Sequence, residues 1–138
     1  MRKTPSSILF ACNMNSVRSP MAEALARHIL PEAIHVDSCG VYKGALDPFV
    51  KTALEHAGIA PPPLGPREFG EVNVSDYDVI VALTPEAAAE ARRLHDNVEF
   101  WEVENPTDTR GSEQDLHAAY GRLCSALQKH IRERFISE

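Results

Sequence analysis

Short apolar runs recur along the chain and predict four β-strands. They cover residues 7–11, 33–38, 78–83 and 98–101. Each run is a few residues long and is bounded by polar or turn-forming residues, which is typical of strands. The third run, "DVIVAL", is continuously apolar after its first residue. Such a run favours a strand that is buried on both faces, as in a parallel sheet.

Between these runs the apolar positions recur with the period of an α-helix. The predicted helices begin near Pro20, Pro48, Pro85 and Ser112 and end near Leu30, Ala57, Leu94 and Ile131. Asp47, Thr84 and Ser112 are residue types that cap helix N-termini, and proline is tolerated in a first turn. Because strands and helices alternate, we expect a parallel sheet with helices on both faces. Ligands of such sheets bind beyond the carboxyl ends of the strands.

Residues 59–75 show no clear period. Connections of this length without secondary structure are uncommon in a compact domain. We therefore expect either a short strand around residues 70–74 or a functional loop. Arg67 in this segment is expected to face water.

Composition narrows the class of protein. The chain has 138 residues, of which 43% are hydrophobic and 25% charged, which fits one globular domain spanning residues 1–138. Its formal net charge of −6 disfavours general binding to nucleic acid. The apolar runs are too short for a membrane span or a signal peptide, so we expect a cytoplasmic protein without a membrane partner.

The cysteines and histidines lack the spacing of metal ligands. The three cysteines are widely separated and form no CxxC pair, and the six histidines form no HxH or HxxxH pair. We therefore predict no metal site and no disulfide framework. No cofactor is expected either.

One predicted strand-to-helix junction carries side chains suited to chemistry. The sequence "CNMNSVRSP" places Cys12 at the end of the first strand and Arg18–Ser19 at the start of the first helix. The first N–H groups of a helix lack acceptors and the helix dipole adds positive charge, so residues 13–18 can surround an anion. Asn13 and Asn15 tolerate the left-handed backbone angles that such a loop needs.

Each of these side chains also has an ordinary structural explanation. Cys12 can be a small buried hydrophobe, Ser19 can cap the helix, and Arg18 can pair with an acidic side chain. Their combination at one junction favours function. A thiolate stabilised by a helix end and a cation is a nucleophile, and a guanidinium matches two phosphate oxygens.

The stretch "CNMNSVRSPMAEAL" resembles the signature of the low-molecular-weight protein tyrosine phosphatase family, which includes the thioredoxin-coupled arsenate reductases. The family pattern is a cysteine, five residues, an arginine, and then serine or threonine. The similarity continues in "DSCGVYKGALDPFVKTALEHAGI", "DYDVIVAL" and "FWEVENPTDTRGSEQDLHAAYGRL". The resemblance implies a single three-layer α/β domain with a four-stranded parallel sheet in the order 2-1-3-4. It also implies a protein tyrosine phosphatase-like hydrolase.

The resemblance assigns roles to individual residues. Cys12 would form a phosphocysteine, Arg18 would bind the phosphoryl group, and Ser19 would stabilise the thiolate. Asn15 would shape the loop by hydrogen bonding to Ser38. The phosphate-binding loop would consist of Asn13, Met14, Asn15, Ser16, Val17 and Arg18. The partner would be a phosphorylated protein or small molecule, or a free oxyanion held in the loop.

The acid loop departs from the family pattern. The family's general acid is an aspartate followed by proline, and Asn105–Pro106 stands at that place. A neutral amide does not donate a proton as a carboxylic acid does. Asp108 is a nearby acid, although a turn explains it, and Asp47–Pro48 is explained by a helix cap. With Asn105 and Asp108 as the candidate catalytic positions here, we expect a weak phosphatase that favours good leaving groups.

Three further positions concern the rim and shape of the loop. Met14 stands where the family commonly has glycine, so the backbone there must take ordinary angles or be strained. Val17 replaces a second loop cysteine common in the family. Tyr42 would line the substrate rim, or is an ordinary exposed tyrosine.

Two other functions stay open. Arsenate mimics phosphate, and its reduction needs further cysteines near the first. Cys39 is a candidate, but packing also explains it, and Cys124, within the last predicted helix, is expected in the core. No cysteine pair follows the third strand, where that branch of the family carries one. The second alternative is a module that binds phosphate or phosphotyrosine without turnover.

Overall fold

The computed structural model describes residues 4–63 and 65–136. Its sheet contains the strands β1 (Ser7–Cys12), β2 (His35–Gly40), β3 (Val79–Ala82) and β4 (Val98–Phe100). All three neighbouring pairs are parallel, and the strand order is β2-β1-β3-β4. The predicted α/β class and the predicted strand order 2-1-3-4 are therefore confirmed.

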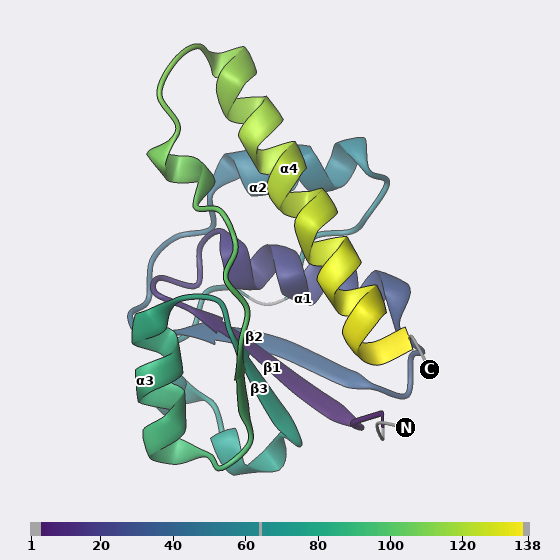
Figure 1. The fold of residues 1–138 in the computed structure, drawn as a ribbon, viewed down its shortest axis with the longest axis vertical. Helices are drawn as coiled ribbons and strands as arrows, with labels where there is room; N and C mark the ends of the chain where they lie inside the picture. Colours follow the sequence, from purple (N-terminus) through teal and green to yellow (C-terminus); the bar gives the residue numbers. More distant parts are fainter. Residues whose placement is uncertain (1–3, 64, 137–138) are drawn as a thin grey trace.

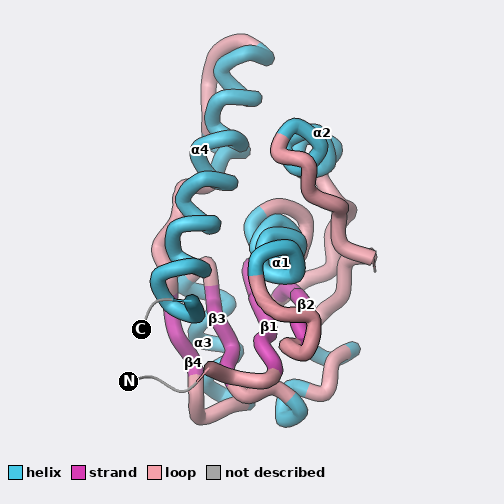
Figure 2. Tube along the Cα trace, turned by 90° about the vertical axis from the view of Figure 1, so that its right-hand side faces the viewer, coloured by secondary structure: helices cyan, strands magenta, loops and turns pink. Residues whose placement is uncertain are grey.

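Four α-helices surround the sheet. They are α1 (Arg18–Ile29), α2 (Pro48–His56), α3 (Pro85–Leu94) and α4 (Glu113–Ile131). In Figure 1, α1, α2 and α4 lie above the strands, and α3 lies at the lower left. Figure 2 shows that α2 lies beyond α1 as seen from the strands. The predicted caps are confirmed, because the side chains of Asp47, Thr84 and Ser112 accept N–H bonds from the first turns of α2, α3 and α4.

The two faces of the sheet have separate apolar cores, as the alternation of side chains along a strand requires. Ile8, Phe10 and Cys12 of β1 point into the core shared with α1 and α4. Leu9 and Ala11 point into the core shared with α3. Among the described residues, no helix is long and apolar enough to cross a membrane.

The remaining turns are short helical segments. The 3₁₀ turns are η1 (Phe69–Glu71), η2 (Val74–Asp76) and η3 (Pro106–Asp108), and a π-helical turn, η4 (Arg132–Ile136), ends the described chain. Of the two alternatives for residues 59–75, the short strand around residues 70–74 is therefore wrong. Among the described residues of this segment, only Glu68 forms an isolated bridge, to Gly40. This segment folds into two 3₁₀ turns over Phe69 and Val74, which are buried under the sheet.

Candidate active site

Cys12 is the last residue of β1 and lies beneath the loop that leads into α1. It is 3% exposed, and its Sγ lies 3.0 Å from Ser19 Oγ. Ser19 lies inside the first turn of α1, whose N-cap is Val17 and has no side-chain cap. The simple role of Ser19 as a helix cap is therefore wrong. Its hydroxyl instead contacts the sulfur, and it also has the Cys39 carbonyl oxygen within 3.2 Å.

The Ser19 hydroxyl has one hydrogen and two acceptors to choose from. With a neutral thiol, the S–H can donate to Ser19 Oγ while the hydroxyl donates to the Cys39 carbonyl. With a thiolate, the same hydroxyl can turn and donate to sulfur. The arrangement therefore accommodates Cys12 in both protonation states.

The segment 41–47 fixes the orientation of the loop peptides. The N–H groups of Val41, Tyr42, Gly44 and Asp47 donate to the carbonyl oxygens of Cys12, Asn13, Met14 and Ser16 at 2.7–3.0 Å. In a trans peptide the C=O and N–H point in opposite directions, so the N–H groups that follow these carbonyls point away from this segment. No backbone N–H of residues 13–17 has an acceptor within residues 4–63 and 65–136.

An open cavity of about 170 Å³ adjoins this loop. Its walls are formed by Cys12, Asn13, Met14, Ser16, Val17, Arg18, Asn105 and Thr107. The half-buried Arg18 forms no ion pair within the described part of the chain. N–H donors without acceptors and an unpaired guanidinium beside one sulfur make a site for a tetrahedral oxyanion.

Asn15 supports the loop from behind. It is 2% exposed and has a φ of 51°, the left-handed conformation expected for it. Its Nδ2 donates to Ser19 Oγ at 2.8 Å and to Ser38 Oγ at 3.0 Å, so the expected link to Ser38 is present. Asn13 differs from expectation, because it has no positive φ.

The end of β2 must approach this loop closely. A Cβ on Gly40 would lie 2.6–2.9 Å from backbone atoms of Tyr42, Asn15 and Asn13. Only glycine fits there, and any larger residue would displace the loop.

Arg67 was expected to face water, and that expectation is wrong. Its backbone N–H donates to Asn15 Oδ1 at 2.8 Å, and its carbonyl accepts from the Gly40 N–H at 2.8 Å. Its guanidinium Nη2 lies 3.3 Å from Asp37 Oδ1 and from the Ser38 carbonyl oxygen. The segment without periodicity therefore supports Asn15 through a residue 52 positions away in sequence.

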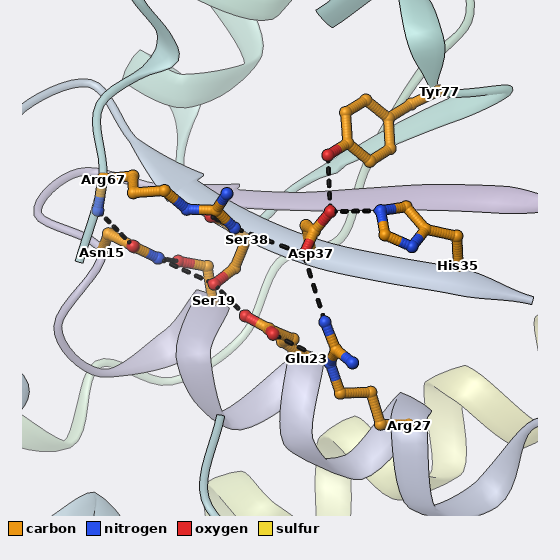
Figure 3. A network of polar contacts seen from close by, with 9 residues as sticks. All are labelled: Asn15, Ser19, Glu23, Arg27, His35, Asp37, Ser38, Arg67 and Tyr77. Atoms are coloured by element: carbon orange, nitrogen blue, oxygen red, sulfur yellow. Dashed lines mark hydrogen bonds and ion pairs between the residues drawn. The ribbon is translucent and has the colours of Figure 1, made fainter. Parts of the chain in front are cut away.

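Asp37 is the centre of the polar network behind the loop (Figure 3). Its carboxylate contacts Arg27, Arg67, His35 and Tyr77 at distances of 2.6–3.3 Å. Burial by itself would raise the pKa of Asp37. The hydrogen bond from Tyr77 and the charges of His35 and Arg67 outweigh that effect and lower the pKa below its usual value.

Glu23 on α1 extends this network to Ser38. The Ser38 hydroxyl donates to Glu23 Oε1 at 2.6 Å, and Arg27 Nε donates to Glu23 Oε2 at 2.9 Å. Burial raises the pKa of Glu23 despite these two partners. The chain of contacts from Glu23 through Ser38 and Asn15 reaches Ser19 and the sulfur.

The altered acid loop forms one wall of the cavity. Asn105 lines the cavity, and its Oδ1 accepts from Thr107 N at 3.2 Å and from Thr107 Oγ1 at 2.8 Å. Asp108 does not line the cavity. Glu104 is held by two bonds from Arg122, which lower its pKa. Its carboxylate is therefore a poor proton donor.

The structure brings most of the predicted site residues together. Asp108 and Tyr42 are exceptions, because neither lines the cavity. Tyr42 lies beside the loop and is 54% exposed. Sequence reasoning missed Thr84 and Glu86, whose side chains bind the Asn13 side chain at 2.6 and 2.8 Å. The helix cap at Thr84 was visible in sequence, but its contact with Asn13, 71 residues away, was not.

The chain is similar to known proteins of one family. The profile of the low molecular weight phosphotyrosine protein phosphatase family matches residues 7–135. The chain is 27% identical over 128 residues to an arsenate reductase of Bacillus subtilis (strain 168), covering 91% of this chain and 92% of that protein.

Solved structures of two kinds are also similar. An arsenate reductase from Archaeoglobus fulgidus DSM 4304 superposes with a TM-score of 0.73 and 28% identity, covering 94% of this chain and 99% of that one. A tyrosine phosphatase of Erwinia amylovora gives a TM-score of 0.73 at 23% identity, covering 94% and 93%. At that identity the second likeness shows the fold alone.

Proposed function

The chain belongs to the low molecular weight phosphotyrosine protein phosphatase family, and on this premise we propose that it is an enzyme that attacks tetrahedral oxyanions with the sulfur of Cys12. One observation carries the proposal. The Cys12 sulfur, the Ser19 hydroxyl, the unpaired Arg18 and a loop of N–H donors without acceptors meet at one cavity.

The reaction proposed first is hydrolysis of phosphate monoesters. The loop N–H groups and Arg18 bind the phosphoryl oxygens, and the Cys12 thiolate attacks phosphorus. The P–O bond to the leaving group breaks as the S–P bond forms. Water then attacks phosphorus, which releases phosphate and regenerates the thiolate that Ser19 stabilises. Arg18 and the loop also stabilise the charge on the equatorial oxygens in both transition states.

The acid wall restricts the substrates. Asn105 occupies the cavity wall without a proton to give, and Glu104 is paired with Arg122. A leaving group must therefore depart as a stable anion or take its proton from solvent. Activated aryl phosphates and acyl phosphates meet this condition, because the conjugate acids of their leaving groups are strong and the leaving anions therefore need no protonation.

The first test is turnover of 4-nitrophenyl phosphate. We expect turnover in the wild type and none in Cys12→Ser, with activity retained in Cys124→Ala, whose thiol lies in α4. Rapid acid quenching and mass spectrometry should find a phosphoryl group on Cys12. Equal turnover in the wild type and in Cys12→Ser would refute the proposal. Phosphate binding without turnover would support a binding module instead.

Arsenate reduction is the second candidate, and the curated relatives favour it over tyrosine phosphatase activity, since relatives that align over 91% of the chain are named arsenate reductases. Arsenate carries no organic leaving group, so the lack of a general acid at Asn105 should slow this reaction less. The Cys12 thiolate would displace a hydroxyl group, lost as water, and form an S–As(V) bond.

The reducing electrons would then come from a thiol in solution. Cys39 points into the core on the other face of the sheet from Cys12, and burial raises its pKa far above the usual value. Leu83 and Thr84, and no cysteine, follow β3. One external thiol attacks the Cys12 sulfur and releases arsenite, leaving a mixed disulfide, and a second thiol reduces that disulfide. Arsenate and two thiols thus give arsenite, one disulfide and water.

A coupled assay separates the two candidates. Arsenate is supplied with glutathione, glutaredoxin, glutathione reductase and NADPH, and NADPH oxidation is followed. Arsenate reduction predicts NADPH consumption that Cys12→Ser abolishes and Cys39→Ser preserves. Turnover of 4-nitrophenyl phosphate without NADPH consumption would support phosphatase activity and exclude arsenate reduction by this thiol system.

A further inference from the structure

Met14 places an apolar side chain at the mouth of the anion cavity. It lines the cavity and is nevertheless 43% exposed, in the middle of a loop whose backbone faces the anion. Its φ is not positive, so the backbone itself gives no reason for a glycine here. The thioether is therefore a surface presented beside the bound oxyanion.

Gly44 leaves the space that this side chain occupies. A Cβ on Gly44 would lie 3.2 Å from Met14 Cβ and 3.4 Å from Met14 Cε. The Met14 side chain thus lies along the Gly44 backbone, next to the segment whose N–H groups hold the loop. Both its Cβ and its terminal Cε lie beside Gly44, and 43% of the residue is still exposed.

The cavity has two kinds of wall. Asn105 and Thr107 form a polar wall, and both are already hydrogen-bonded to each other. Within the loop itself, Met14 and the buried Val17 supply an apolar wall. An oxyanion alone uses only the N–H donors and Arg18. The exposed part of this apolar surface gains a ligand contact only when a hydrophobic group is attached to the oxyanion.

We propose that Met14 is a specificity-determining residue that packs against an aromatic or other apolar group carried by the bound phosphoryl compound. Methionine suits this task because its flexible, polarisable thioether makes favourable contacts with aromatic rings of different shapes. The inference rests on the proposed function and narrows its substrates to aryl or similarly apolar phosphate esters. Free arsenate would gain nothing from Met14.

Binding of two phosphonates tests the inference without requiring turnover. Phenylphosphonate and methylphosphonate have the same type of head group and differ in the apolar group. Their dissociation constants are measured by calorimetry for the wild type, Met14→Ala, Met14→Leu and Leu94→Ala. Leu94 is a matched control, since it is 45% exposed at the end of α3 and lies outside the cavity wall.

We expect the wild type to prefer phenylphosphonate. Met14→Ala should reduce this preference by about 2- to 10-fold, the size of a sulfur–aromatic contact. Methylphosphonate affinity should change little, and Met14→Leu should restore most of the preference. Leu94→Ala should match the wild type.

Two results would overturn the inference in distinguishable ways. If both phosphonates bind and Met14→Ala keeps the wild-type preference, the role of Met14 is wrong while the oxyanion site stands. If neither phosphonate binds the wild type, the oxyanion site itself is wrong, and the inference fails together with the proposed function.

Discussion

At the scale of single residues, Asn105 separates the geometry of the acid loop from its chemistry. Its Oδ1 accepts two hydrogen bonds from Thr107 and opens the turn η3. An aspartate could accept the same two bonds. The asparagine therefore preserves the shape of the loop but lacks the acidic proton that an aspartic acid at this position would donate.

Replacing Asn105 by aspartate should restore that proton. We expect Asn105→Asp to raise kcat for phenyl phosphate by about 100-fold, the lower end of general acid catalysis. The rate for 2,4-dinitrophenyl phosphate, a much better leaving group, should rise far less. Steady-state kinetics on both esters gives the answer. An equal rise for both would show that the substitution acts on something other than leaving-group protonation.

The sequence predicted individual loop residues unevenly. Asn15 was expected in a left-handed conformation with Ser38 as its partner, and both features are found because they follow from the local turn and a specific motif. Asn13 was given the same backbone role, but its side chain is bound by Thr84 and Glu86. These contacts join elements that are distant in sequence, so no local sequence pattern predicts them.

At the scale of elements, strands and capped helices were predictable, and the support behind the loop was not. The caps at Asp47 and Thr84 follow from residue type next to proline. The segment 59–75 has no period because its residues do not share one face. Phe69 and Val74 enter the core, whereas Arg67 reaches Asp37. Only the folded chain shows that this segment supports Asn15.

Asp47 joins two helices as well as capping one. Its Oδ1 accepts from Phe49 N in α2, and its Oδ2 accepts from the Tyr120 hydroxyl in α4 at 2.7 Å. Tyr120→Phe should lower the free energy of unfolding by about 1.5 kcal/mol, the value of a hydrogen bond to a charged group. Urea denaturation measures this change. Tyr42→Phe, at an exposed tyrosine, should change it by less than about 0.5 kcal/mol. A neutral Tyr120→Phe would mean that α2 and α4 do not depend on this bond.

Asp37 makes the stability of β2 depend on pH. Removing the charge of Asp37 breaks its ion pair with Arg67, whose side chain is only 20% exposed. We expect Asp37→Asn to cost about 3 kcal/mol at pH 7, as when one partner of a buried ion pair is removed.

The sign of the pH effect follows from the lowered pKa of Asp37 in the folded state. Its stabilisation is present above the unfolded carboxyl pKa of about 4 and is lost as pH falls through the lower folded value. The gap between wild type and Asp37→Asn in urea denaturation should therefore shrink below about pH 4. Glu23, whose pKa burial raises, is present in both proteins. The exposed Asp96→Asn should show no such gap, and a constant gap for Asp37→Asn would contradict the assignment.

At the scale of the whole molecule, binding and folding are linked through the loop. The proposed oxyanion site exists only when β1, the 41–47 segment and α1 are assembled, so an anion that binds there should stabilise the entire fold. At a phosphate concentration about 100 times Kd, the gain is about 2.7 kcal/mol.

Thermal unfolding with and without phosphate checks this linkage. Phosphate should raise the Tm of the wild type and leave that of Arg18→Ala almost unchanged. Arg93→Ala on α3, an exposed arginine paired with Glu90, should respond like the wild type. An equal shift in Arg18→Ala would place the bound phosphate elsewhere.

The positions of the three cysteine thiols also determine how the protein reacts with peroxide. Neither Cys39 nor Cys124 lines the cavity that contains Cys12. A sulfenic acid formed on Cys12 thus has no neighbouring thiol in its cavity with which to condense, and further oxidant carries it to the irreversible sulfinic and sulfonic acids. Under oxidative stress, survival of the proposed nucleophile therefore depends on small thiols from solution that form a reversible mixed disulfide with Cys12 before further oxidation.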